Sequence, residues 1–166
     1  MPHSSLRKAL VALFIGAGAS LAWSSESPDA VFDRYVAAVH AGDMAAVRAL
    51  IAPDVERSDF VGCRPEMNNP VCLAHYIETT VVHPKAQFTL LHRQREGDTV
   101  TARLEVRSAW YSKVGVERIV GQDIVRVRDG LIHAFRFVPD FRDEPTAVFF
   151  GTLGIGPRAS QKSVSK

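Results

Sequence analysis

An aspartate on the apolar face of a strand is the first candidate for chemistry in this sequence. The segment RIVGQDIVRVRDG, residues 118–130, has the two-residue period of a β-strand. One face carries Asp123 together with Ile119, Val125 and Val127, and the other face carries arginines. Because burial disfavours the ionised form of a carboxyl group, we expect a raised pKa for Asp123 and a neutral acid that can donate a hydrogen bond.

A tyrosine near the N-terminus is the second candidate. In SPDAVFDRYVAAVHAGD, the positions of Phe32, Tyr35, Val36 and Val39 follow the spacing i, i+3, i+4, i+7, which predicts an amphipathic helix. Tyr35 and a neutral Asp123 would be two donors able to converge on one carbonyl oxygen. In the simpler alternative, Tyr35 is a core residue, and the aspartate bonds only nearby backbone groups or lies at a solvated rim.

The helices that would position these residues come first in the chain. Ser27 and Pro28 are typical of a helix start, Gly42 of a helix end, and Asp43 can cap a second helix over MAAVRALI. VERSDFVG predicts a short strand, and LAHYIETTVV predicts a third helix.

After Pro84 the apolar pattern changes to period two. Four antiparallel strands are expected in AQFTLLHRQ, VTARLEVRSAWYS, the opening segment and LIHAFRFV, with a hairpin signal at Asp129-Gly130. Helices followed by such a meander predict the α+β class, with helices packed on one face of a curved sheet and a cone-shaped pocket between them. The inner face of the second strand is expected to extend as far as Trp110. The residues expected to line this pocket are Phe32, Val39, Phe88, Trp110, Val125 and Phe135.

The extreme N-terminus has the pattern of a secretory signal peptide. MPHSSLRK is basic, ALVALFIGAGASLAW is apolar, and cleavage near Ala22 would remove residues 1–22. A membrane anchor is the alternative, but the apolar run is shorter than the roughly 20 residues that span a bilayer. Cleavage would leave 18 basic and 18 acidic residues, without the excess of Lys and Arg that nucleic-acid binding requires. We therefore expect an exported protein with neither a nucleic-acid partner nor, after cleavage, a membrane association.

The only two cysteines of the chain are Cys63 and Cys72, in the polar stretch GCRPEMNNPVC. In an oxidising compartment the simplest interpretation is a disulfide that closes this short loop. A redox or zinc pair is the alternative, but it would need CxxC spacing or further ligands. No spacing of ligand residues favours a metal, and we expect no cofactor.

Two segments carry a resemblance to a known family. Residues 34–62, RYVAAVHAGDMAAVRALIAPDVERSDFVG, resemble without a gap the N-terminal part of the bacterial ketosteroid isomerases, and GQDIVRVRDG resembles a later strand of theirs. These enzymes have the nuclear-transport-factor-2-like fold, as do the SnoaL-type polyketide cyclases. The resemblance implies a SnoaL-like domain over residues 26–145, and the composition of residues 146–166 predicts a flexible C-terminal tail.

Carried over position by position, the resemblance implies roles for three residues. Tyr35 would be an oxyanion-hole donor, Asp59 the catalytic base, and Asp123 the second donor, an acid kept neutral. Phe60 departs from the pattern, because the isomerases have proline after the base. The implied activity is an isomerase-, cyclase- or dehydratase-type reaction on a small apolar carbonyl compound.

A non-catalytic module that binds a small apolar ligand or a partner in the same cone is the alternative function. In that case Asp59 would simply cap a turn. The resemblance also implies a possible homodimer through the outer face of the sheet. That face is expected to be polar and to carry Thr101, Arg103, Glu105, Arg107 and Tyr111.

Overall fold

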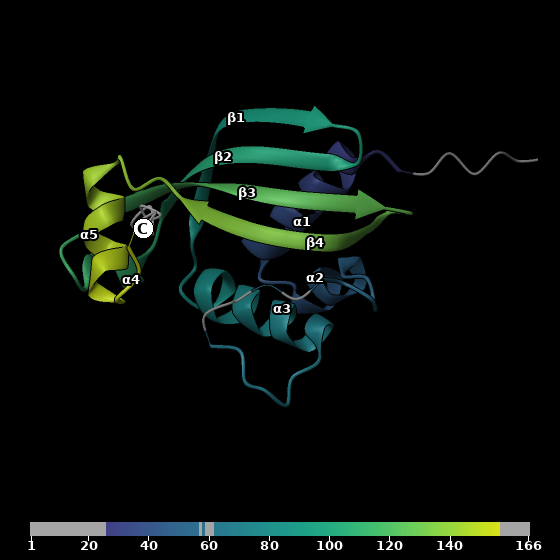
Figure 1. Ribbon diagram of the computed structural model, residues 1–166, viewed down its shortest axis with the longest axis horizontal. Helices are drawn as coiled ribbons and strands as arrows, with labels where there is room; N and C mark the ends of the chain where they lie inside the picture. Colours follow the sequence, from purple (N-terminus) through teal and green to yellow (C-terminus); the bar gives the residue numbers. More distant parts are fainter. Residues whose placement is uncertain (1–25, 57, 59–61, 157–166) are drawn as a thin grey trace, which may run out of the picture.

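A computed structural model describes residues 26–56, 58 and 62–156 (Figure 1). The proposed signal peptide, Asp59 and Phe60 lie outside the described residues. The elements in chain order are helices α1 (Pro28–Ala41), α2 (Met44–Leu50) and α3 (Asn69–Ile77), a π-helical turn η1 (Glu78–Val82), strands β1 (Gln87–Glu96) and β2 (Thr99–Arg107), helix α4 (Ala109–Ser112), strands β3 (Arg118–Arg128) and β4 (Leu131–Pro139), and helix α5 (Glu144–Thr152).

The first two helices begin where the sequence predicts, and α1 also ends there, whereas α2 ends at Leu50, one residue before the end of MAAVRALI. The Ser27 hydroxyl accepts a hydrogen bond from the Ala30 amide at 3.2 Å, and the Asp43 carboxylate accepts one from Ala46 at 2.9 Å. Gly42 ends α1 with a φ of 70°, a left-handed conformation that glycine adopts without a Cβ clash. Local capping therefore fixes the ends of the helix that carries Tyr35.

The third helical segment differs from its prediction in two ways. It begins four residues earlier than LAHYIETTVV, because Asn68 caps it by accepting a hydrogen bond from the Val71 amide. It then widens into η1, where the hydroxyl of Thr80 donates to the carbonyl of Tyr76 at 2.8 Å. Such side-chain bonds compete with the helical ladder, which explains the change of helix type. The described residues of VERSDFVG form no strand.

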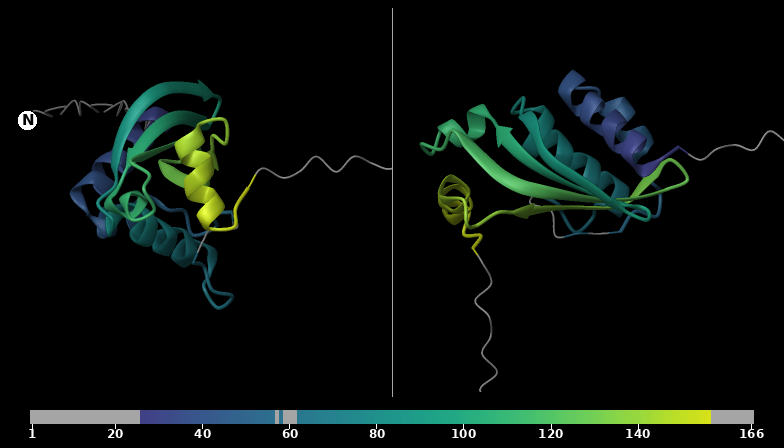
Figure 2. Two further views of the ribbon diagram at one scale, coloured as in Figure 1. Left: turned by 90° about the vertical axis from the view of Figure 1, so that its left-hand side faces the viewer. Right: turned by 90° about the horizontal axis from the view of Figure 1, so that it is seen from above.

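The four strands form one antiparallel sheet in the order β1-β2-β3-β4, so the predicted meander and α+β class are confirmed. Figure 2 shows α1 lying across one face of this curved sheet and α5 at one end of it. The face of β3 toward the helices is buried as the alternation predicts, and so is that of β2, with Val100, Ala102, Leu104 and Val106.

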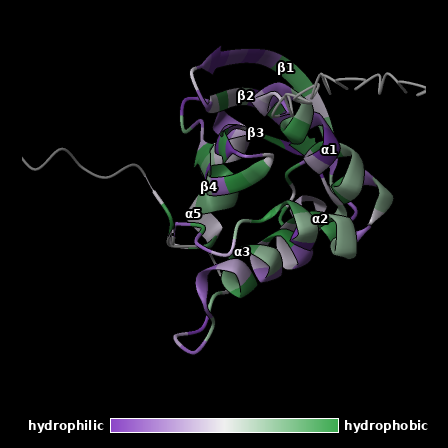
Figure 3. Ribbon diagram, turned by 90° about the vertical axis from the view of Figure 1, so that its right-hand side faces the viewer, coloured by the Kyte–Doolittle hydropathy of each residue, from purple (hydrophilic) through white to green (hydrophobic). Residues whose placement is uncertain are grey.

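Strand β1, at the sheet edge, is irregular. Its register shifts between Leu90 and His92, and Leu90 is 47% exposed. Beyond the shift, Arg93 forms an ion pair with Asp33 of α1 and lies 5.0 Å over the buried ring of Phe32. Figure 3 shows that the arrowhead end of β1 is hydrophilic. The contacts of Arg93 with Asp33 and with the Phe32 ring therefore hold α1 against the sheet where the apolar pattern ends.

The segment after β2 departs from the predicted strand. β2 ends at Arg107, and the Ser108 hydroxyl caps α4 by accepting a hydrogen bond from the Trp110 amide at 3.1 Å. Trp110 thus lies on a short helix and not on a strand face. Tyr111, expected on the outer face of the sheet, is buried on the inside.

The C-terminal region also departs from the prediction of a flexible tail from residue 146. Residues 144–152 form α5, which is capped by Asp143, has Pro145 in its first turn, and packs Phe149 into the core. Residues 157–166 lie outside the described part of the chain. Within the ranges that the structure describes, none of the helices has the length and apolar character that crossing a membrane requires.

Candidate functional site

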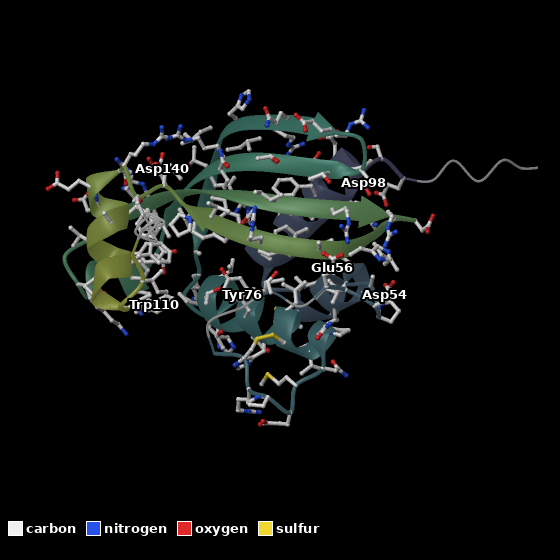
Figure 4. The ribbon with its side chains drawn as sticks, viewed as in Figure 1. Asp54, Glu56, Tyr76, Asp98, Trp110 and Asp140 are labelled. Carbon is white, nitrogen blue, oxygen red and sulfur yellow. A yellow bond between two sulfur atoms is a disulfide. The ribbon has the colours of Figure 1, made fainter. Side chains whose placement is uncertain are left out.

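A cavity of about 70 Å³ lies between the sheet and the helices, and its walls are mostly aromatic. α1, α3, α4 and α5 contribute Tyr35, Tyr76, Trp110, Tyr111, Phe149 and Phe150. Strands β1 and β4 contribute Phe88, Phe135 and Phe137. Asp123 is the one carboxyl group among the described residues that line the cavity. Figure 4 labels Tyr76 between α3 and the sheet, and Trp110 at the end of the molecule where α5 lies.

Asp123 enters the cavity from the centre of β3. It is only 3% exposed, and its cross-strand neighbours are Ala102 and Phe137. No hydrogen bond joins its carboxyl group to another side chain or backbone group of the described chain, so burial alone raises its pKa to about 7. Near neutral pH this carboxyl group can therefore donate a hydrogen bond when it is protonated and accept one when it is ionised.

Tyr35 enters from the helix side. Its side chain is 1% exposed, and its ring packs edge-on against Phe135 with centroids 5.5 Å apart. Its hydroxyl has no hydrogen-bond partner among the described residues. Burial, and then the negative charge of Asp123, raise the pKa of Tyr35 well above its usual value, so the hydroxyl remains a donor.

Two further tyrosines, Tyr76 and Tyr111, reach the same cavity and were not proposed from the sequence. Burial raises the pKa of each hydroxyl, and the charge of Asp123 raises it further. A signal for Tyr76 existed, because Leu73, Tyr76, Ile77 and Thr80 follow helical spacing. Tyr111 had none, because the strand was expected to continue through it.

The other predicted site residues are only partly brought together. Phe88, Trp110 and Phe135 line the cavity, whereas the remaining three predicted lining residues are core residues that do not line it, namely Phe32, Val39 and Val125. The structure therefore places Tyr35 and Asp123 at one cavity and leaves the position of Asp59 undescribed. Ser58, the residue before it, donates a hydrogen bond to the Phe135 carbonyl at 3.1 Å.

The cysteine loop is closed by a disulfide between Cys63 and Cys72, whose Cα atoms are 5.3 Å apart. Because Cys72 belongs to α3, the bond ties the loop to the helix that carries Tyr76. Among the described residues, no group of His, Cys, Asp and Glu side chains is arranged to hold a metal ion.

The chain belongs to the SnoaL-like domain family, whose model matches residues 32–135. Comparison with curated proteins found no match.

Solved structures support the same fold. A ketosteroid isomerase from Mycobacterium sp. is similar at 21% identity and a TM-score of 0.55, over 70% of this chain and 96% of that chain. A Mycobacterium tuberculosis protein solved in complex with estradiol-17beta-hemisuccinate is 19% identical, with a TM-score of 0.54, over 70% and 97%. A putative polyketide cyclase from Sinorhizobium meliloti is 17% identical, with a TM-score of 0.52, over 65% and 93%. At these identities the likeness concerns the nuclear-transport-factor-2-like fold alone.

Proposed function

We propose that this protein binds a small apolar molecule through one carbonyl or phenol oxygen, which accepts hydrogen bonds from Tyr35 and Asp123. The observation that carries this proposal is that the Tyr35 hydroxyl and the Asp123 carboxyl group, both buried, line one aromatic cavity and have no hydrogen-bond partner among the described residues. Buried polar groups in folded proteins are nearly always hydrogen-bonded, so an unpaired pair at a cavity is typical of a ligand site. The aromatic walls supply the apolar contact.

The finer proposal is that the bound carbonyl compound reacts. Asp59 would take a proton from the carbon next to the carbonyl, and the electron pair would move into the carbonyl to form an enolate. Tyr35 and Asp123 would stabilise the enolate oxygen by hydrogen bonding, and protonated Asp59 would return the proton at the same or another carbon. The reaction consumes no cofactor, and its class is isomerase- or cyclase-like. The similar ketosteroid isomerase and putative cyclase support this choice.

Binding without catalysis is the second candidate function. It is favoured by the estradiol-17beta-hemisuccinate complex of a protein with the same fold. It needs only the cavity and its two polar groups, and it makes no demand on Asp59.

Ligand titration tests the binding proposal. 2-Naphthol, a fluorescent phenol, should bind the wild-type protein and Asp123→Asn, because the amide keeps a donor in place. Asp123→Leu should lose roughly 5- to 150-fold in affinity, since removing one partner of a buried hydrogen bond costs roughly 1–3 kcal/mol. Equal affinity of wild type and Asp123→Leu would contradict the proposal.

Hydrogen exchange tests the finer proposal without a known substrate. Small cyclic enones in deuterated water should lose the NMR signal of the proton next to the carbonyl when the protein is added. Asp59→Asn should abolish this exchange and leave 2-naphthol affinity unchanged. Binding without exchange by the wild-type protein would favour the second candidate function.

Export and dimer formation complete the proposed setting. The signal-peptide pattern of residues 1–22 and the disulfide support an oxidising compartment.

A homodimer would use the outer face of the sheet, where Arg103 and Glu105 are partly exposed. Sedimentation at micromolar concentration should give twice the mass of the mature chain, and a monomer would contradict that part of the proposal.

A further inference from the structure

Aromatic residues from α4 and α5 line one end of the cavity. The ring of Phe149 lies edge-on to Tyr111, with centroids 4.6 Å apart, and edge-on to Trp110 at 5.3 Å. Phe150 follows at 5.3 Å from Phe149. We call Trp110, Tyr111, Phe149 and Phe150 the end wall.

The end wall continues onto the sheet through Phe137. The Phe137 and Phe150 rings are stacked, with centroids 6.2 Å apart and planes inclined by 22°. Phe137 lies against the backbone of Gly121, where a Cβ atom would stand 2.3 Å from its ring carbon Cζ. The absence of a side chain at Gly121 therefore lets an aromatic ring cover β3 between Asp123 and Ile119.

The volume of the cavity limits the size of the ligand that it can hold. Asp123 and Ile119, four residues apart on β3, both line the cavity. Its volume is about 70 Å³, and one water needs roughly 10–15 Å³ of such space. The space thus holds five to seven water-sized groups, as many as a single substituted ring or a compact pair of fused rings occupies.

We propose that the end wall is a size filter, in which Phe149 and Phe150 restrict the ligand to compounds of one or two rings and exclude tetracyclic ones. The inference rests on the proposed function, because it assumes that the ligand oxygen lies at Tyr35 and Asp123. It separates this chain from a steroid-binding role, although proteins of the same fold include a ketosteroid isomerase and one in complex with an estradiol derivative.

Polar bonds hold α5 in place independently of its aromatic side chains. The buried hydroxyl of Thr146 accepts a hydrogen bond from the Val120 amide of β3 at 2.7 Å. The guanidinium of Arg118 donates to Asp143, the N-cap of α5, at 2.9 Å. These bonds form beyond Pro139, where β4 ends and can no longer pair with β3. Because the helix is anchored at its first turn, shortening Phe149 should enlarge the cavity without releasing α5.

The part of the end wall that belongs to α5 lies beyond the matched family segment. The family model matches residues 32–135, whereas α5 spans residues 144–152. The two donors, Trp110 and Tyr111 are inside the matched segment, and Phe149 and Phe150 are outside it. Oxygen recognition and ligand size can therefore be changed by separate substitutions.

The test compares 2-naphthol with estradiol, a tetracyclic phenol, by fluorescence titration and calorimetry of the mature, oxidised protein. The wild type should bind 2-naphthol at least tenfold more tightly than estradiol. Phe149→Ala should gain at least tenfold in affinity for estradiol, and the double change Phe149→Ala with Phe150→Ala should gain more. Val148→Ala is the control, because Val148 is on the same helix, is 48% exposed and does not line the cavity. It should leave both affinities unchanged.

Three results would overturn the size filter: tight binding of estradiol by the wild type, no gain in Phe149→Ala, or an equal gain in Val148→Ala. If Phe149→Ala does not fold, as judged by its near-UV dichroism, Phe149→Leu provides the same comparison with a smaller gain. A different result would contradict the proposed function itself. In that case Asp123→Leu would bind 2-naphthol as well as the wild type does, whatever the size preference. Binding of neither phenol by any variant would contradict both proposals.

Discussion

Replacing Asp123 by asparagine should change how the stability of the protein depends on pH. The pKa of Asp123 is about 7 in the folded protein, against 3.8 for an unperturbed aspartate. Between these two values the folded state binds more protons than the unfolded state, so this group makes the free energy of unfolding fall as pH rises. Each unit of difference between the folded and unfolded pKa corresponds to about 1.4 kcal/mol of unfolding free energy. The loss of stability due to Asp123 is therefore absent well below pH 3.8 and reaches about 4 kcal/mol above pH 7.

Asparagine has nearly the same shape and does not titrate, so Asp123→Asn should remove this loss. Urea denaturation from pH 4 to pH 8, followed by tryptophan fluorescence, gives the free energy of unfolding of both proteins. The variant should be close to the wild type at pH 4 and more stable by about 4 kcal/mol at pH 8. The two proteins differ only at residue 123, so the difference between the two curves isolates that residue. Parallel curves would show that the carboxyl group is not desolvated, and the neutral-donor role would fail with it.

Three further predictions concern other parts of the site. Tyr35→Phe should keep or raise stability, because the lost hydroxyl is buried and has no partner in the described part of the chain, while phenol affinity falls about tenfold. Destabilisation would reveal a structural role for the hydroxyl. Gly121→Ala should cost about 1–3 kcal/mol in urea denaturation, since its Cβ would overlap the Phe137 ring. Gly151→Ala, on α5 with open space around it, is the control and should be neutral or slightly stabilising. The denatured, unreduced mature protein should titrate no free thiol, and two thiols per chain would contradict the disulfide.

The sequence alone predicted the elements whose signals are local. The caps of α1 are adjacent residues, and the alternation along β3 is enough to bring Asp123 to the inner face. The same local rules place Tyr35 on the buried side of α1, so both proposed donors could be found without coordinates.

The end wall could not be predicted in the same way. The residues from Val100 to Trp110 keep the two-residue alternation of one continuous strand. The chain leaves the strand and begins α4 because Ser108 caps that helix with a hydrogen bond. For α5, the start signal of an acidic cap followed by proline was present at residues 143–145, but the Gly- and Ser-rich composition after it favoured a tail. Whether Phe149 meets Tyr111 depends on two connections folding onto each other, and no local pattern encodes that contact.

The stability that the protein loses by burying Asp123 and the Tyr35 hydroxyl is itself an argument for a ligand. An ionised Asp123 lowers stability by about 4 kcal/mol above pH 7, and an unpartnered tyrosine hydroxyl costs roughly 1–3 kcal/mol more. Single domains are stable by only about 5–15 kcal/mol in total, so this is a large fraction of what folding provides. Phenylalanine and leucine at the two positions would avoid the cost and preserve the fold. A ligand oxygen that accepts from both groups would recover part of it on binding, and it would do so only for molecules short enough to stop at the end wall.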